Sequence, residues 1–309
     1  MNKRLIFSIV AACAFIILLS VIVKRVAISR SSRHLKMTQN RVQAIYDYAD
    51  TLTNNKEYEK AKRAYEIVSN QKINPAKKED ALFKLASIYE KDNSPIKARD
   101  AYRKIIDEFP DSARIADAKK EYEKKNMSLL LSDIITKDSV VYEVKSGDTL
   151  GKIAKKYNTT VYLLRKSNHT NNDIIVPRQR LKVSKGTFGI LVDKSQNVLM
   201  LKRNGDIIKT YIVSTGANNS TPEGKFVVEE KLISPVWYKM GAIVSPDSPD
   251  YELGKYWMGI SRQGYGIHGT SDQSSIGKHI TKGCVRMSEK DIEELFSIAP
   301  TGTTVEIVN

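Results

Sequence analysis

An internal repeat at an offset of 37 residues constrains this chain most strongly, and it lies within residues 42–112. One unit of such a repeat cannot bury its apolar face alone, so neighbouring units must stack to form a shared core. Each unit is expected to form two amphipathic helices with small residues where the helices approach closely. The recurring residues are Ala61, Ala64 and Tyr65, matched by Ala98, Ala101 and Tyr102, and Tyr46 and Ala49, matched by Phe83 and Ala86.

The repeat resembles the tetratricopeptide family, whose period is ~34 residues. Pro110 matches the proline that ends a unit, and turns are expected at residues 56–58 and 93–95. Two units and a further helix near residues 115–125 give a helical repeat region over residues 40–126, followed by a linker over 127–140. Such a region is either a groove that binds a protein partner or a spacer.

The N-terminus carries an apolar run from Leu5 to Val23 without a charged residue. Nineteen residues are enough for a helix to cross a bilayer, so we expect a transmembrane anchor over 5–23 with a short cytoplasmic tail over 1–4. A cleaved signal peptide is the main alternative, but Lys24 and Arg25 follow directly where small residues are expected. Lipidation at Cys13 is less favoured, because the apolar run continues beyond it.

The net charge of +15 is distributed unevenly along the chain. Residues 187–309 hold 13 basic and 14 acidic residues, whereas residues 140–184 hold nine basic and three acidic ones. A basic segment indicates a polyanionic partner or an anionic surface, and no motif here is typical of nucleic-acid binding. With only two cysteines, Cys13 and Cys284, a disulfide framework is excluded, and Cys284 is expected to be a free thiol.

Residues 141–184 predict a small βααβ module. Gly147 turns the chain after a short strand, Asp148 or Thr149 can cap a helix, and Leu150 begins its apolar face. This stretch resembles a LysM module, a family that binds polymers containing N-acetylglucosamine such as peptidoglycan. The resemblance implies that residues 147–150, together with the loop near 172–177, line a glycan groove. The alternative is that they only stabilise the fold, which we favour for Leu150.

Residues 187–309 predict a mainly β domain with one clear helix late in the chain. Runs of β-branched residues alternate with turns, and Asn204-Gly205 between two such runs is a strong hairpin signal. Ser288 is expected to cap the late helix, and residues 304–308 form a last strand.

The residues that carry chemistry lie at 266–270, 275–277 and 281–287 in this domain. A free thiol at Cys284 and an imidazole at His268 are the minimum for thiol nucleophilic catalysis. Lys282 and Arg286 flank the cysteine and are expected to favour its thiolate. Gly283 permits a close backbone approach, so N–H groups near Cys284 are candidates for an oxyanion hole.

The same string resembles the L,D-transpeptidase catalytic domain, also called the YkuD-like domain, across essentially all of residues 187–309. Two differences from the usual pattern are Thr281 in place of serine and Lys282 in place of a second histidine. The resemblance implies that Cys284 is the nucleophile and His268 the general base and acid. It also implies that Gly269 or Thr281 orients His268. Arg286 either binds a substrate carboxylate or braces the cysteine loop. The residues singled out are Cys284, His268, Gly283, Gly269, Thr281 and Arg286, and in the LysM-like module Gly147, Asp148, Thr149 and Leu150.

The implied reaction is acyl transfer from a peptidoglycan stem peptide through a Cys284 thioester, giving 3→3 cross-links without metal or cofactor. A zinc site of His268, His279 and Cys284 is disfavoured because no fourth ligand is evident, and His279 is expected in a surface loop. An L,D-carboxypeptidase and an enzyme that attaches proteins to the wall are alternatives. A non-catalytic, membrane-tethered scaffold that binds the wall is another. In each case the main part of the chain is expected on the cell-wall side of the membrane.

Overall fold

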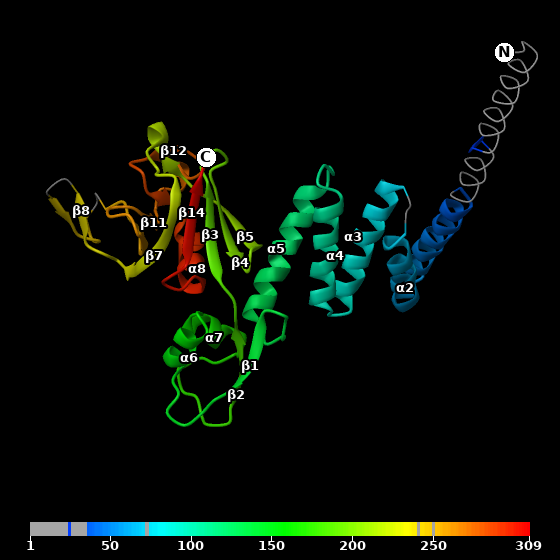
Figure 1. The fold of residues 1–309 in the computed structure, drawn as a ribbon, viewed down its shortest axis with the longest axis horizontal. Coiled ribbons are helices and arrows are strands. Elements are labelled where there is room, and N and C mark those ends of the chain that lie inside the picture. Colours follow the sequence, from blue (N-terminus) through cyan, green and yellow to red (C-terminus); the bar gives the residue numbers. More distant parts are fainter. Residues whose placement is uncertain (1–23, 26–35, 72–73, 240–241, 249–250) are drawn as a thin grey trace, which may run out of the picture. The chain divides into compact units, whose positions relative to one another are not determined.

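A computed structural model describes residues 24–25, 36–71, 74–239, 242–248 and 251–309 (Figure 1). The chain divides into two compact units, residues 1–119 and 120–309. The predicted anchor over Leu5–Val23 lies outside the described residues. Within the described part, no helix is both long enough and apolar enough to cross a membrane.

The first unit is made of helices that follow the predicted repeat. Helical residues 36–54 come first, followed by α2 (Tyr58–Ser69), α3 (Pro75–Lys91), α4 (Pro95–Glu108) and the start of α5 (Ile115–Leu131). The turns before α2 and α4 each contain one residue with a positive φ, Lys56 and Asn93, and these two residues are one repeat apart. Ala61 and Ala98 are both fully buried, which confirms that small residues lie where the helices pack closely.

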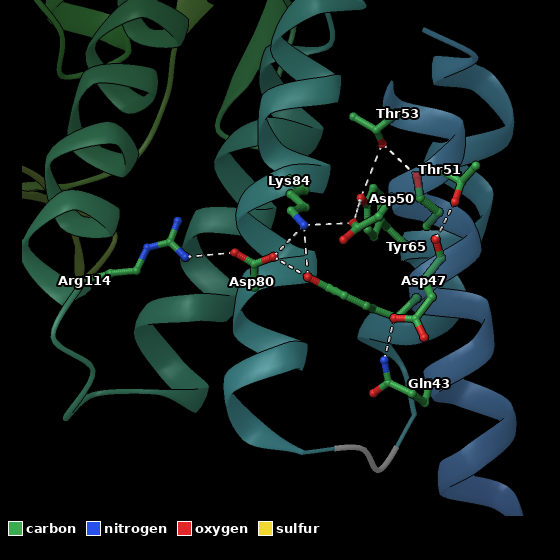
Figure 2. A network of polar contacts seen from close by, with 11 residues as sticks. Gln43, Asp47, Asp50, Thr51, Thr53, Tyr65, Asp80, Lys84 and Arg114 are labelled. Carbon is green, nitrogen blue, oxygen red and sulfur yellow. Dashed lines mark hydrogen bonds and ion pairs between the residues drawn. The ribbon is translucent and has the colours of Figure 1, made fainter. Parts of the chain in front are cut away.

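A polar network ties the helices of this unit together (Figure 2). The ammonium of Lys84 lies 2.8 Å from a carboxylate oxygen of Asp50 and 2.9 Å from one of Asp80. The hydroxyl of Tyr65 donates to Asp50, and Arg114 pairs with Asp80 at 3.2 Å. Burial and the Asp50 carboxylate raise the pKa of Tyr65. These charged groups therefore contact one another and fix how neighbouring helices pack.

The LysM-like module has the predicted βααβ order. Its strands β1 (Ser139–Glu143) and β2 (Arg180–Ser184) pair antiparallel, and between them lie α6 (Leu150–Lys156) and α7 (Val161–Ser167). Thr149 and Thr160 cap these two helices through side-chain oxygens that accept from backbone N–H groups.

The second unit also contains an eight-stranded mixed sheet, which confirms the mainly β prediction. Its strand order is β13-β11-β10-β7-β14-β3-β4-β5, with β14 parallel to β3 and β11 parallel to β13. The Asn204-Gly205 turn between β4 and β5 has positive φ at both residues, as the hairpin signal predicts. The strands of this sheet are β3 (Phe188–Asp193), β4 (Val198–Arg203), β5 (Asp206–Ile212), β7 (Gly224–Ile233), β10 (Tyr256–Ile260), β11 (Gly266–His268), β13 (Val285–Arg286) and β14 (Thr304–Val308).

Two short pairs of strands accompany the sheet, β6 (Thr215–Gly216) with β12 (His279–Thr281) and β8 (Trp237–Lys239) with β9 (Ala242–Val244). The late helix α8 (Glu289–Ile298) packs its apolar side into the core of the sheet. Ser288 caps α8, as predicted, by accepting from the N–H of Asp291.

The LysM-like module and the end of α5 are packed into this same unit. Leu163 of α7 and Met127 and Leu130 of α5 belong to the core of the sheet domain. Thr160 donates to the carbonyl of Ser297 at 2.7 Å, and the side chain of Asn126 donates to the carbonyl of Ile207 at 3.1 Å. Helix α5 thus extends through the first five residues of the expected linker, and those residues contribute to the core.

Candidate active site

The register of β10, β11 and β13 brings the two candidate catalytic residues to one corner of the sheet. Ile267 pairs with Val285, and His268 pairs with Arg286 in parallel strands. Ile267 and Val285 belong to the buried core, so alternation along the strands places His268 and Arg286 on the opposite face. Cys284 directly precedes β13 at the level of Gly266. The two side chains are therefore expected on one face, and the backbone positions of the two residues are displaced by about 7 Å along the strands.

The imidazole of His268 is buried, and only 3% of the residue's surface is exposed. It contacts the backbone directly after β11 and the side chain of Trp257 in the neighbouring strand β10. Its Nδ1 lies 2.7 Å from the carbonyl oxygen of Gly269. A carbonyl can only accept, so Nδ1 carries the hydrogen and Nε2 keeps the lone pair of a base. The indole of Trp257 stacks on the ring with centroids 6.0 Å apart and planes at 24°.

His268 is neutral in this environment. Burial lowers the pKa of His268 to about 4, and the positive charge of Arg286 acts in the same direction. The carbonyls of Gly269 and Leu253 and the carboxylate of Glu252 oppose this lowering without reversing it. A neutral imidazole is the form that can accept a proton from a thiol.

Cys284 is a free, partly buried thiol whose Sγ lies 3.8 Å from the carbonyl oxygen of Gly264. Burial raises the pKa of Cys284, and this outweighs the backbone at Gly266 and the charge of Arg286, which both lower it. The charge of Arg286 favours the thiolate, as expected, but burial outweighs it and the resting thiol stays neutral. The exposed Lys282 is not among the groups that shift this pKa. The resting pair is a neutral thiol and a neutral imidazole.

Thr281 and Gly283 shape the loop that presents the thiol. The Thr281 hydroxyl donates to the carbonyl of Cys284 at 2.6 Å and accepts from the N–H of Gly283 at 3.2 Å. Gly283 has φ +126°, and a Cβ there would lie 2.7 Å from the ring of Tyr265, so a side chain at this position would be strained. Of the two candidates for orienting His268, the Gly269 carbonyl makes the contact, whereas Thr281 holds the cysteine loop.

Arg286 is fixed at its backbone by exchanging two 2.8 Å hydrogen bonds with Ser214. Its side chain, 12% exposed, donates through Nη2 to Glu252 at 3.2 Å. Glu252 was missed by sequence reasoning because it lies 34 positions from Arg286 in a segment without a motif. Glu289 follows the cysteine motif closely, but it was missed because its contact is with Lys255, 34 positions away, and no local pattern signals that contact. Its carboxylate accepts from the N–H of Lys255, and a Cβ added at Gly269 would meet it at 2.3 Å.

His279 is an exposed residue at the start of strand β12, and within the described residues its ring makes no hydrogen bond to His268. Its Nδ1 lies 2.8 Å from the Thr215 hydroxyl, and its Nε2 lies 3.1 Å from the side-chain nitrogen of Asn197. The residue is exposed as expected, but it stands in a short strand and its ring holds β12 in place.

The residues singled out in the LysM-like module have roles in its fold. Asp148 accepts from the hydroxyl of Tyr142 and from the N–H of Lys145, both at 2.8 Å, and these bonds lower the pKa of Asp148. Leu150 is buried, and Gly147 has φ +80° in the turn. Whether this loop also binds glycan stays a prediction.

Three family models match the chain. An L,D-transpeptidase catalytic domain matches residues 187–307, a LysM domain matches 142–184 and a tetratricopeptide repeat matches 80–112. A putative L,D-transpeptidase YkuD of Bacillus licheniformis is 34% identical over 177 residues, covering 54% of this chain and 98% of the relative. The putative L,D-transpeptidase YkuD of Bacillus subtilis is 33% identical over 175 residues, with the same coverage.

Among solved structures, an L,D-transpeptidase of Mycobacterium tuberculosis has a TM-score of 0.36 at 18% identity, covering 43% of this chain and 63% of that one. The catalytic domain of the Enterococcus faecium L,D-transpeptidase has a TM-score of 0.33 at 25% identity, covering 40% of this chain and 98% of that one. The sequence relationship to the two Bacillus proteins extends over 98% of the length of each. The chain belongs to the L,D-transpeptidase family.

Proposed function

We propose that this enzyme forms 3→3 cross-links in peptidoglycan through a thioester on Cys284, with His268 as the general base and acid. One observation supports this more than any other. His268 donates through Nδ1 to the Gly269 carbonyl, which leaves Nε2 as a base on the sheet face that Cys284 is expected to share.

In the first step, His268 Nε2 takes the thiol proton as Cys284 Sγ attacks the carbonyl between the third stem residue and the terminal D-alanine. Because both groups rest neutral, the proton moves as the carbon–sulfur bond forms. The oxyanion needs an N–H donor, and the N–H of Gly283 already donates to Thr281. The N–H of Cys284 has no acceptor within the described residues, so we take it as the donor to the oxyanion.

The tetrahedral intermediate then breaks its carbon–nitrogen bond, His268 returns the proton to the leaving nitrogen, and D-alanine departs. In the second step an amine of a neighbouring stem gives a proton to His268 and attacks the thioester. The carbon–sulfur bond breaks, and the sulfur takes this proton back from His268, which restores the thiol. No metal or cofactor has a part in this sequence. With water as the acceptor, the same steps would make the enzyme an L,D-carboxypeptidase.

We propose that the regions before the catalytic domain bring the enzyme to peptidoglycan. The LysM module would bind the N-acetylglucosamine-containing glycan, and residues 5–23 would anchor the chain in the membrane with its main part on the cell-wall side. The helical repeats would bind a protein partner or act as a spacer.

The test of the acyl-enzyme is mass spectrometry of the full chain after exposure to a carbapenem, and then to a tetrapeptide stem donor. We expect one adduct, on Cys284, that is absent in Cys284→Ala and slower to form in His268→Ala. Cys13→Ala is the matched control, because it removes the only other cysteine and should leave the adduct unchanged. No adduct, together with unchanged wall cross-linking in Cys284→Ala cells, would leave the non-catalytic scaffold as the better interpretation.

The choice between transpeptidase and carboxypeptidase is tested separately with purified muropeptides. We expect the acyl-enzyme to form a dimer when an acceptor stem amine is present. Release of free tripeptide at the same rate with and without acceptor would favour the carboxypeptidase, and transfer to a protein amine would favour protein attachment.

A further inference from the structure

Arg286 stands beside both reacting residues. It is the register partner of His268 in the parallel pair β11–β13, and it lies two positions after Cys284. Its charge lowers the pKa of both residues, as expected for a guanidinium near each of them. Alternation along β13 places its side chain on the face that also carries His268.

The guanidinium of Arg286 is only partly satisfied by hydrogen bonds. Nη2 makes one bond to Glu252 at 3.2 Å, while the buried Nε has no partner among the described residues. An arginine presents a planar fork that a carboxylate fills with two parallel hydrogen bonds. Within the described part of the chain, the guanidinium of Arg286 therefore makes only one of the two hydrogen bonds that it could make to a carboxylate.

Glu252 has features of a replaceable occupant. Its side chain is 49% exposed, whereas that of Arg286 is 12% exposed. It lies in the irregular segment before β10, beside Leu253, whose carbonyl faces His268. A carboxylate from a bound ligand can thus reach the fork if Glu252 moves aside.

The proposed function supplies a ligand carboxylate at a suitable distance, and the inference rests on that function. In a donor stem that ends with D-alanine, three bonds separate the scissile carbonyl carbon from the terminal carboxylate carbon, which is at most about 4 Å. Residues 284 and 286 are about 7 Å apart along their strand, and the long arginine side chain can reach across this interval.

We propose that Arg286 binds the C-terminal carboxylate of the leaving D-residue and that Glu252 occupies this position in the free enzyme. The enzyme would thereby select donor stems that end at the fourth residue. In a stem that continues past this residue, or ends in an amide, an uncharged group replaces the carboxylate and cannot fill the fork with two charged acceptors. With such a donor the buried Nε stays without a partner, as in the free enzyme, so the wrong donor gains less binding free energy than the acid does.

The experiment compares two tetrapeptide donors that differ only at the C-terminus, one with a free acid and one with a carboxamide. Cys284 acylation is followed by mass spectrometry, and kcat/KM for release of D-alanine or D-alaninamide is measured. The ratio of the two values within one variant cancels any change in thiol reactivity. We expect the wild-type enzyme to prefer the acid by about tenfold or more.

Arg286→Gln should bring this ratio close to one, and Glu252→Gln should raise it by lowering KM for the acid while leaving the amide unaffected. Glu306→Gln is the matched control for Glu252→Gln, because Glu306 is also half-exposed, at 48%, and pairs with a cation far from the site. It should leave the ratio unchanged.

Equal use of both donors by the wild-type enzyme would overturn the inference while leaving the proposed function intact, as would an undiminished ratio in folded Arg286→Gln. If neither donor acylates Cys284 in the wild type, the proposed function fails and the inference fails with it. If Arg286→Gln does not fold, the wild-type ratio and the Glu252→Gln ratio decide between selection of a carboxylate and bracing of the loop.

Discussion

The active-site corner and the junction with the LysM module each bury one titratable side chain against backbone carbonyls, yet they use it differently. His268 is 3% exposed and bonds the Gly269 carbonyl. Lys182 of β2 is 5% exposed, and its ammonium donates to the carbonyls of Leu129, at 2.7 Å, and Ser132. Burial lowers the pKa of each, to about 4 for His268 and about 8 for Lys182.

The difference lies in what remains on each group after its hydrogen bonds are made. A neutral imidazole that donates through one nitrogen keeps a lone pair on the other, so burial leaves it ready for proton transfer. An ammonium has donors only, and at neutral pH Lys182 acts as a cation at the C-terminal end of α5, where free carbonyls attract positive charge. Burial against backbone carbonyls therefore leaves His268 reactive, whereas it gives Lys182 a structural role.

The strongest test of this contrast is His268→Gln, which keeps a polar side chain but removes the base. We expect kcat/KM for acyl transfer to fall by about 10²–10⁴, the usual contribution of a general base. Denaturant unfolding at pH 7 should change little by comparison. A variant that retains most of its activity would show that another group takes the thiol proton.

A second test uses the pH dependence of stability. The unfolded state binds a proton on His268 below its ordinary pKa of 6.5, whereas the folded state resists it until about pH 4. Stability from this residue is thus fully present above pH 6.5 and is lost as pH falls toward 4, by about 3 kcal/mol at pH 4. Denaturant titrations of wild type and His268→Gln at pH 7 and pH 4 measure the difference, and parallel losses in both proteins would contradict it.

Lys182→Met tests the junction. It removes the donor to two carbonyls near the end of α5, so we expect the free energy of unfolding to fall by about 1–3 kcal/mol while kcat is retained. Both tryptophans, Trp237 and Trp257, lie in residues 187–309, so their fluorescence reports on the catalytic domain.

A shift in that fluorescence transition, caused by a substitution in the LysM module, would show that the two unfold together. Lys155→Met is the control, because Lys155 is an exposed lysine of the same module. An unchanged transition in Lys182→Met would mean that the module unfolds independently.

The smallest effect is expected from Trp257→Leu, which removes the ring stacked on His268. An aromatic pair contributes about 0.5–1.5 kcal/mol beyond its buried area, so kcat/KM should fall by up to roughly tenfold. Glu230→Gln, which alters only the contact at 3.3 Å with the indole nitrogen, should have less effect. A loss as large as that of His268→Gln would mean that the ring does more than position the imidazole.

Sequence alone predicted the elements better than the contacts between them. The strand over Thr304–Val308 and the Ser288 cap appear as expected, since both depend on local alternation or local hydrogen bonds. Motifs singled out Cys284 and His268, but the carbonyl that orients the imidazole depends on backbone geometry.

The contact between Glu252 and Arg286 and the burial of Lys182 had no local signal. Alternation in β2 places Lys182 on the face opposite to Leu181 and Val183. What covers that face comes from residues 50 and 53 positions earlier. A pattern read over a few neighbouring residues cannot contain that information.

The short connection from the LysM module to the sheet restricts how the module can move. Only residues 185–187 separate β2 from β3, and Leu163 of the module lies in the core of the sheet domain. The module is thus fixed to the catalytic domain and does not swing on a tether. A glycan strand bound to the module would present its stem peptides at a fixed distance from Cys284. The dimensions of the enzyme would then set the spacing of the cross-links.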